Sequence, residues 1–166
     1  MAKKFLSFIA DKYDEKEFIY PYYRLQEEGY EVDIAGTKAE EYKGKDGLAQ
    51  KADITFADVN VEDYAGLVIP GGFAPDRMRQ DKDALEIVRK FHEQKKPIAM
   101  ICHAGWVGIS AGILDGVRAT ATTAIKDDMV NAGVEWSDEP VIDGNIVTAR
   151  NPGDLPVYVK MILELL

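Results

Sequence analysis

The feature that most constrains the fold of this chain is the regular alternation of short apolar runs with longer amphipathic segments. Short apolar runs are typical of strands buried on both faces, and apolar residues at helical spacing indicate helices with one buried face. The predicted strands are 5–10, 30–35, 67–69 and 97–101, and the predicted helices are 14–28, 83–94, 103–112, 122–132 and 154–166. Strands that alternate with helices build βαβ units, so we expect an α/β fold with a mostly parallel sheet and helices on both faces.

Three local patterns refine this prediction. Residues 36–58 are richer in polar side chains and predict a small hairpin or flap, and residues 141–148 predict a β-hairpin around the turn signal Asp143-Gly144. Pro21 inside the first helix predicts either a kink or a later start of that helix. We find no internal repeat and no linker, so we expect a single domain over residues 1–166.

Acidic residues outnumber basic ones, which gives a formal net charge of -9 and an isoelectric point of about 4.7. An acidic surface repels phosphate backbones, so we expect no nucleic-acid partner. No apolar stretch is long enough to span a bilayer, and residues 1–12 do not form a signal peptide. We therefore expect no membrane association and a cytoplasmic location, where a lone cysteine serves either packing or chemistry.

The only cysteine, Cys102, follows a wholly apolar strand and is followed by the small residues Ala104 and Gly105. This pattern is typical of a nucleophile elbow, in which a sharp strand-to-helix turn lifts the reactive side chain above the sheet. A helix that begins near His103 directs its positive end at Cys102, which favours the thiolate and lowers the pKa of the thiol. Backbone N–H groups there can also bind an oxyanion. Alternatively, Cys102 is a buried small hydrophobic residue, although the elbow pattern favours the nucleophile.

The chain has two histidines, and His103 is the better candidate for the base that serves Cys102. His92 lies on a polar helix face and is interpreted as a surface residue. The alternative for His103 is a side chain at the helix start that points away from Cys102. With one cysteine and two histidines we expect no metal site, and nothing in the sequence calls for a cofactor.

Two further strand ends carry candidate residues. Gly71 and Gly72 follow a buried strand, and such a pair permits a positive φ and close approach of the backbone to a ligand, although a plain turn is the commoner role. Asp14 and Glu17 follow the first strand, where Glu17 near Cys102 would exchange protons and have a raised pKa. From the residues alone, a capping box formed by Asp14 and Glu17 is the simpler interpretation.

The order of these motifs resembles the ThiJ/PfpI superfamily, and in particular its branch of PfpI-type intracellular proteases. The resemblance extends over essentially the whole chain. The segments that carry it are Ile19-Tyr20-Pro21-Tyr22, Pro70-Gly71-Gly72 with Ala74-Pro75, Ile101-Cys102-His103, Ile109-Ser110-Ala111-Gly112, Ile125-Lys126-Asp127-Asp128-Met129 and Asn131-Ala132-Gly133-Val134-Glu135-Trp136.

The resemblance implies a flavodoxin-like three-layer sandwich related to the class I glutamine amidotransferases. It implies that Cys102 is the nucleophile, followed by His103, and that Glu17 is the acid near the cysteine, with Asp14 beside it. The oxyanion donors fall on backbone amides around Gly72 and His103, with Gly71 and Ala104 adjoining. The resemblance also implies a homodimer or homohexamer with active sites near subunit boundaries, in which Asp76 of a neighbouring subunit orients the histidine.

The chain departs from the family pattern at three places. Asp76 stands where the protease branch has glutamate, so its carboxylate reaches about one methylene less far. Ala104-Gly105-Trp106 replaces Gly-Pro-Gln after the Cys-His pair and brings an indole to the pocket rim. Thr122-Thr123 replaces Tyr-Pro and removes a phenol from the cleft. These changes reshape the substrate site and leave the nucleophile in place.

The resemblance implies two enzymatic activities and the sequence leaves both open. The first is the conversion of methylglyoxal-like aldehydes or their protein adducts, in the manner of glyoxalase III and deglycases, by a Cys102 thiolate. The second is ATP-independent peptide hydrolysis, which needs a complete Cys-His-acid triad. A non-catalytic, redox-sensing stress protein is the third possibility, because a low-pKa thiol oxidises readily.

Overall fold

In the computed structural model, which describes residues 3–166, one mixed seven-stranded sheet runs through the molecule in the order β10-β11-β7-β6-β1-β2-β5. All neighbouring strands are parallel except β10 and β11, which form an antiparallel pair. The strands are β1 (Lys4–Phe8), β2 (Glu31–Gly36), β5 (Ile54–Thr55), β6 (Tyr64–Ile69), β7 (Ile98–Ile101), β10 (Val141–Asp143) and β11 (Ile146–Ala149). The mostly parallel sheet is therefore confirmed, while the predicted start of the domain at residue 1 lies outside the described residues.

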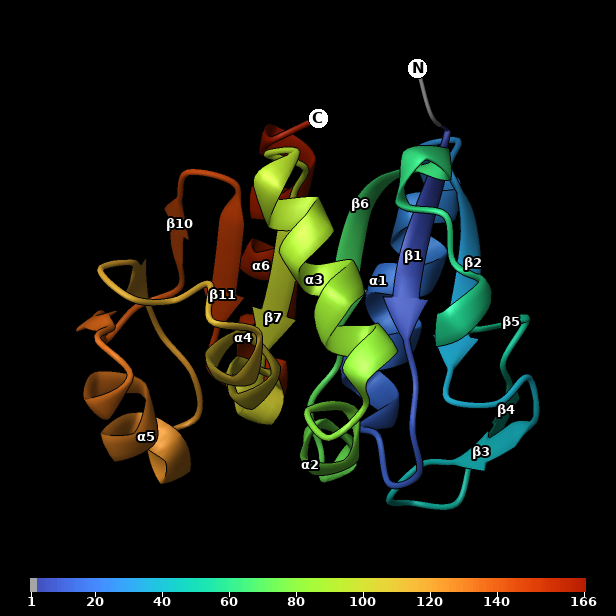
Figure 1. Cartoon of the computed structure of the whole chain (residues 1–166), viewed down its shortest axis with the longest axis horizontal. Coiled ribbons are helices and arrows are strands. Elements are labelled where there is room, and N and C mark those ends of the chain that lie inside the picture. Colours follow the sequence, from blue (N-terminus) through green and yellow to red (C-terminus); the bar gives the residue numbers. More distant parts are fainter. Residues whose placement is uncertain (1–2) are drawn as a thin grey trace.

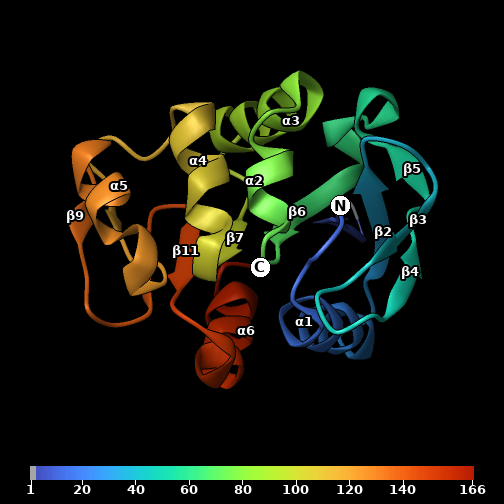
Figure 2. The ribbon, with the colours of Figure 1, turned by 90° about the horizontal axis from the view of Figure 1, so that it is seen from below.

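Helices cover both faces of the sheet, which makes three layers (Figure 2). Helices α2, α3 and α4 lie on one face, and α1 and α6 lie on the other, while α5 lies at the end of the sheet that β10 and β11 form (Figures 1 and 2). The helices are α1 (Glu15–Glu27), α2 (Ala74–Met78), α3 (Lys82–Glu93), α4 (Gly105–Ala111), α5 (Lys126–Asn131) and α6 (Leu155–Glu164). Two hydrophobic clusters fill the spaces on either side of the sheet, as the buried strands predicted.

Two small sheets complete the fold. The segment 36–58 contains the predicted hairpin, formed by β3 (Glu41–Lys43) and β4 (Ala49–Lys51). A parallel pair, β8 (Arg118–Ala119) with β9 (Glu135–Trp136), lies near α5. The hairpin around Gly144 also forms, as β10 and β11.

The structure differs from the predictions at two helices. The helix predicted over residues 122–132 is reduced to α5 and a preceding 3-10 turn at Thr123–Ile125. Thr122 stays extended because its backbone N–H donates to the carbonyl oxygen of Cys102 at 3.3 Å. The first helix begins at Glu15 and continues through Pro21, so a later start is wrong. No helix within residues 3–166 has the length and apolarity that crossing a membrane requires.

Candidate active site

The carboxyl ends of β1, β6 and β7 meet at one edge of the sheet, which is the lower edge in Figure 1. In open parallel sheets this edge is where ligands bind. Three predicted groups arrive there: Cys102 after β7, the pair Gly71 and Gly72 after β6, and Asp14 with Glu17 after β1. The strand register thus brings together residues that lie far apart in the sequence.

Cys102 occupies a sharp turn between β7 and α4, as the elbow predicts. Its φ is +60°, one of three positive values among non-glycine residues 3–166, and it opens a 3-10 turn, Cys102–Ala104. A left-handed backbone costs a non-glycine residue about 1–2 kcal/mol, so the surrounding structure must hold it in place. All four residues of β7 are buried, and Gly105 packs so closely that an added Cβ would lie 2.7 Å from Met129 Sδ. The elbow is therefore fixed from both sides.

Gly71 packs against both Cys102 and Glu17 of the first helix. An added Cβ on Gly71 would lie 2.7 Å from Cys102 Cβ, 2.7 Å from Glu17 Oε1 and 3.0 Å from the carbonyl oxygen of Ile101. No larger residue fits at this position without moving the nucleophile or the acid. The sequence predicted a close approach of backbone to ligand here, and the structure shows a close approach of backbone to two side chains.

Gly72 has a φ of +79° and forms an isolated antiparallel bridge with Tyr13. Its backbone N–H and that of His103 both act on the Cys102 sulfur and lower the pKa of the thiol. Two converging N–H donors at a nucleophile are the arrangement that also stabilises an oxyanion. The Ala104 side chain, by contrast, is fully buried in the hydrophobic core and does not face the cleft.

Glu17 is completely buried, and neither of its carboxyl oxygens has a hydrogen-bond partner within residues 3–166. Asp14 caps α1 by accepting from the backbone N–H groups of Lys16 and Glu17, but Glu17 does not reach back, so only half of the capping box forms. Burial, followed by the charge of Asp14, raises the pKa of Glu17 to about 8. A carboxyl group that keeps its proton near neutral pH can act as a general acid.

The pKa of the Cys102 thiol differs from the prediction. Burial, followed by the charge of Glu17, raises the pKa of Cys102 to about 11, although the backbone N–H groups of His103 and Gly72 lower it. The helix was expected to lower the pKa of the thiol, but this effect is small because α4 has only seven residues and a 3-10 turn precedes it. The part of the rise due to Glu17 exists only while Glu17 is ionised, so Cys102 and Glu17 titrate as a pair. A proton on Glu17 therefore favours the thiolate.

Lys45 is a member of this site that the sequence analysis missed. Its Nζ lies 2.6 Å from Asp14 Oδ2, and its charge lowers the pKa values of Glu17 and His103. Lys45 comes from the turn of the β3–β4 hairpin, and its backbone N–H donates to the carbonyl oxygen of Tyr13. Only the polar character of residues 36–58 hinted that this segment reaches the cleft.

His103 contacts the nucleophile directly, with 3.3 Å between its Nδ1 and Cys102 Sγ. Burial lowers the pKa of His103, which keeps the ring neutral near pH 7. The ring lies beside Trp106, with 5.2 Å between ring centroids, and Trp106 is held by Asp128 and Arg79. The indole that the sequence predicted at the pocket rim thus lies beside His103.

Asp76 does not join the site within one chain. It lies in α2, it is exposed, and no carboxylate within residues 3–166 pairs with His103. A single chain therefore supplies a nucleophile, a neighbouring imidazole and a buried acid, but no acid that orients the imidazole. Across residues 3–166, no three potential metal-ligating side chains from His, Cys, Asp and Glu cluster closely enough to hold an ion.

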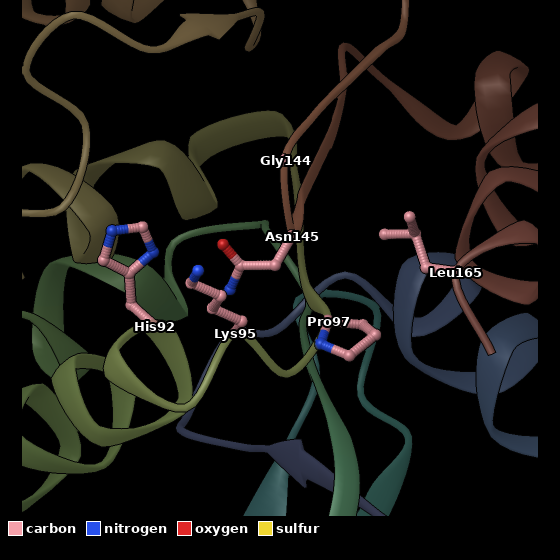
Figure 3. A pocket seen from close by; sticks show the side chains of 6 residues that line it. All are labelled: His92, Lys95, Pro97, Gly144, Asn145 and Leu165. Carbon is pink, nitrogen blue, oxygen red and sulfur yellow. The ribbon is translucent and has the colours of Figure 1, made fainter.

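A separate hollow lies at the opposite edge of the sheet (Figure 3). Its volume is about 410 Å³, and it includes Pro97 and Asn145, which immediately precede β7 and β11. The amino ends of these strands face away from Cys102. The candidate active site is therefore the cleft around Cys102, not this hollow.

The comparisons with known proteins agree with this geometry. The sequence model of the DJ-1/PfpI family matches residues 3–165. The chain is 47% identical to Deglycase PfpI of Pyrococcus furiosus over 98% of this chain and 99% of that protein. It is 38% identical to YraA of Bacillus subtilis, whose name suggests a cysteine protease, over 100% of this chain and 99% of YraA.

A solved structure of a two-domain protein from Anabaena variabilis, with DJ-1/ThiJ/PfpI-like and ferritin-like domains, superposes with a TM-score of 0.96 and 40% identity. The match covers 98% of this chain and 47% of that one. The flavodoxin-like fold class is thereby confirmed. From the match to the family model and the near-full-length relatives, the chain belongs to the DJ-1/PfpI family.

Proposed function

We propose that this chain is a cysteine-dependent enzyme that converts methylglyoxal-like aldehydes, or their adducts on proteins, in the manner of glyoxalase III and deglycases. A relative that is 47% identical over nearly its full length is named a deglycase, which supports this class of reaction. The observation that carries the proposal is that Cys102 and Glu17 both lie against Gly71, each with an atom 2.7 Å from the position that a Cβ on Gly71 would take. A sulfur nucleophile and a buried, protonated carboxyl group suit addition to a small carbonyl.

The first step is addition to the aldehyde. The Cys102 thiolate forms a bond to the carbonyl carbon, and the carbonyl electron pair moves to oxygen. The N–H groups of Gly72 and His103 stabilise the developing negative charge, and Glu17 donates the proton that completes a hemithioacetal. Glu17 is left as a carboxylate next to the adduct.

The second step moves a proton within the adduct. For methylglyoxal, the Glu17 carboxylate removes the proton from the carbon that bears sulfur and returns it to the neighbouring carbonyl carbon, while the hydroxyl proton of the adduct passes to the oxygen on that carbon, which gives a thioester of lactate. Water then hydrolyses the thioester to lactic acid and a thiol, and the thiol proton passes to Glu17, which restores the thiolate and the protonated acid. The carbon that is oxidised and the carbon that is reduced belong to one molecule, so methylglyoxal and water balance lactate without a cofactor.

Peptide hydrolysis is the second candidate, and the name of the YraA relative favours it. Its weakness in this chain is His103, which has no acid partner within residues 3–166, since Asp76 is exposed in α2. A homodimer or homohexamer that places Asp76 of a neighbouring subunit beside His103 would complete the triad. Phe73, which is 62% exposed and lies near His103, supports a subunit contact at this rim.

The test compares the wild-type chain with Cys102→Ser in two assays, methylglyoxal consumption with lactate detection and cleavage of fluorogenic casein. We expect wild-type lactate production that the variant lacks. Cleavage of casein that depends on Cys102, without lactate production, would replace the proposal with the peptidase. If neither activity depends on Cys102 and peroxide converts the thiol to sulfinic acid, the redox-sensing alternative is favoured.

A further inference from the structure

A groove of about 530 Å³ lies beside the cleft, between the loop after β1, the β3–β4 hairpin and α2. Six charged residues line it, four of them cationic although the chain carries a net charge of -9. These residues are Lys12, Lys43, Lys45, Arg77, Asp11 and Glu41. A local excess of positive charge on an acidic protein selects anionic ligands.

The groove is rigidly built around Lys12. Lys12 has a φ of +63°, a conformation in which lysine is strained. Its N–H donates to the carbonyl oxygen of Lys43 at 2.7 Å, and its own carbonyl accepts from the N–H of Phe73 at 2.9 Å. Asp11 Oδ1 in turn accepts from the backbone N–H of Lys43 at 3.1 Å, so one acidic group is engaged in holding the hairpin.

The same residues connect the groove to the nucleophile. An added Cβ on Gly72 would lie 2.5 Å from the carbonyl oxygen of Lys12, and the Gly72 N–H faces the Cys102 sulfur. Lys45 lines the groove and also pairs with Asp14, next to Glu17. Lys45 therefore lines the groove and also belongs to the site of Cys102, and the Gly72 loop packs against Lys12 of the groove.

Lys12, Lys43 and Arg77 form no ion pair within residues 3–166, whereas Lys45 is already paired with Asp14. We propose that these three cations bind a phosphate carried by the substrate whose aldehyde adds to Cys102. The inference rests on the proposed function and narrows its substrate class to phosphorylated aldehydes. A dianion is matched by several cations that a rigid backbone holds around one groove.

The experiment measures how well an aldehyde protects Cys102 from alkylation by iodoacetamide, a readout that needs binding and addition but no turnover. Glyceraldehyde 3-phosphate is compared with glyceraldehyde and with glyoxylate, which carries a carboxylate instead. We expect the phosphorylated aldehyde to protect wild-type Cys102 at a concentration about tenfold lower than glyceraldehyde, with the advantage shrinking as salt increases. Better protection by glyoxylate than by the phosphorylated aldehyde would replace phosphate with carboxylate and overturn the assignment.

The groove variant combines Lys12→Asn, Lys43→Gln and Arg77→Gln, in which Asn tolerates the left-handed backbone at position 12. The control variant removes the same charge elsewhere, with Lys82→Gln, Lys90→Gln and Lys160→Gln at exposed helical positions. We expect the groove variant to lose the preference for the phosphorylated aldehyde and the control to keep it. If the groove variant keeps the wild-type preference for the phosphorylated aldehyde over glyceraldehyde, the proposal is overturned. If the triple variant does not fold, the same comparison is made with the single variant Lys12→Asn.

Failure of the proposed function, which is addition of Cys102 to an aldehyde, can be distinguished from failure of anion binding in the groove. If no aldehyde protects Cys102, addition to carbonyls fails, and the groove is judged from the alkylation rate with iodoacetate relative to iodoacetamide. We then expect this ratio to fall about fivefold or more in the groove variant and to stay unchanged in the control, because only iodoacetate is an anion. A ratio that is equal in wild type and both variants overturns the inference.

Discussion

Glu17 and Cys102 both lie against a single glycine, so that one added methyl group on Gly71 would come within 2.7 Å of both the carboxyl oxygen Oε1 and Cβ of the cysteine. The acid comes from α1 and the nucleophile from the end of β7, and the backbone after β6 packs against both of them. This relationship links the stability of the site, its titration and its chemistry, and several predictions depend on it.

Gly71→Ala should damage the site more than the fold. The new methyl group forces Cys102 or Glu17 to move, and overpacking of this kind costs about 1–3 kcal/mol of unfolding free energy. We expect a lower melting temperature and loss of Cys102-dependent turnover. Gly153→Ala is the control, because its added Cβ would meet only Asn151 Oδ1 at 3.0 Å. A Gly71→Ala variant with full activity would contradict the described geometry.

Glu17 should make the protein less stable as pH rises. Its pKa is about 8 in the folded chain against an ordinary value of 4.5, so the folded state holds a proton that the unfolded state releases. The stabilisation is complete below pH 4.5 and declines up to pH 8, by at most about 1.4 kcal/mol per pH unit. Urea unfolding should show this decline for wild type and not for Glu17→Gln. The exposed Glu93→Gln variant should follow wild type, and parallel curves for Glu17→Gln would refute the assignment.

Glu17→Gln should also separate thiol reactivity from proton transfer. The amide keeps the shape of the carboxyl group but cannot exchange a proton with the adduct. We expect methylglyoxal turnover to fall by roughly 10²–10⁴-fold, the usual contribution of a general acid–base group. Alkylation of Cys102 by iodoacetamide should stay within about tenfold of wild type, because the two N–H donors remain. Equal losses in both measurements would mean that Glu17 acts on the thiol alone.

The left-handed turn at Cys102 predicts an unusual order of stabilities. Cys102→Gly should be more stable than Cys102→Ala by about 1 kcal/mol, because glycine adopts a φ of +60° without strain. The same exchange at Ala104, whose φ is -60°, should favour alanine instead. Thermal unfolding of the three variants and the wild type, which already carries Ala104, tests both expected differences, and a more stable alanine at position 102 would contradict the strained elbow.

Asp76→Asn distinguishes the two enzymatic candidates. Asp76 does not contact His103 within the chain, so we expect methylglyoxal turnover to change by less than about threefold, as for an exposed surface substitution. Light scattering on the same samples controls for the oligomeric state. A loss of about tenfold or more at an unchanged oligomeric state would mean that a neighbouring subunit supplies this carboxylate to the catalytic step.

The order of elements could be predicted from the sequence because apolar runs and helical spacing are local signals. Local sequence is enough to predict the strands around Leu67 and Ile98 and the helix that ends near Gln94. The helix predicted from Thr122 begins later than expected for a non-local reason, because the N–H of Thr122 donates to the carbonyl oxygen of Cys102, twenty positions earlier. The sequence predicted that Asp14 caps the first helix, but it did not predict that the carboxyl group of Glu17 has no hydrogen-bond partner within residues 3–166.

The residues of the candidate site also fall into two groups, those that local sequence patterns identify and those that only long-range contacts bring into the site. Cys102 and the glycines could be identified from their positions at strand ends. Lys45 could not, because it reaches Asp14 only through the docking of a hairpin on the loop after β1. The direction of the Cys102 pKa was also mispredicted, since it depends on burial and on Glu17, neither of which a local motif reveals.

The left-handed turn at Cys102 has a consequence for how this protein can change over time. The backbone alone presents position 102 at the edge of the sheet, and the surfaces around it lie on other segments, at Phe73, Trp106 and the β3–β4 hairpin. Mutations on those segments can therefore alter which molecules are accepted while the reactive atom stays where it is. Divergence of substrate range from one ancestral scaffold then requires no rebuilding of the nucleophile.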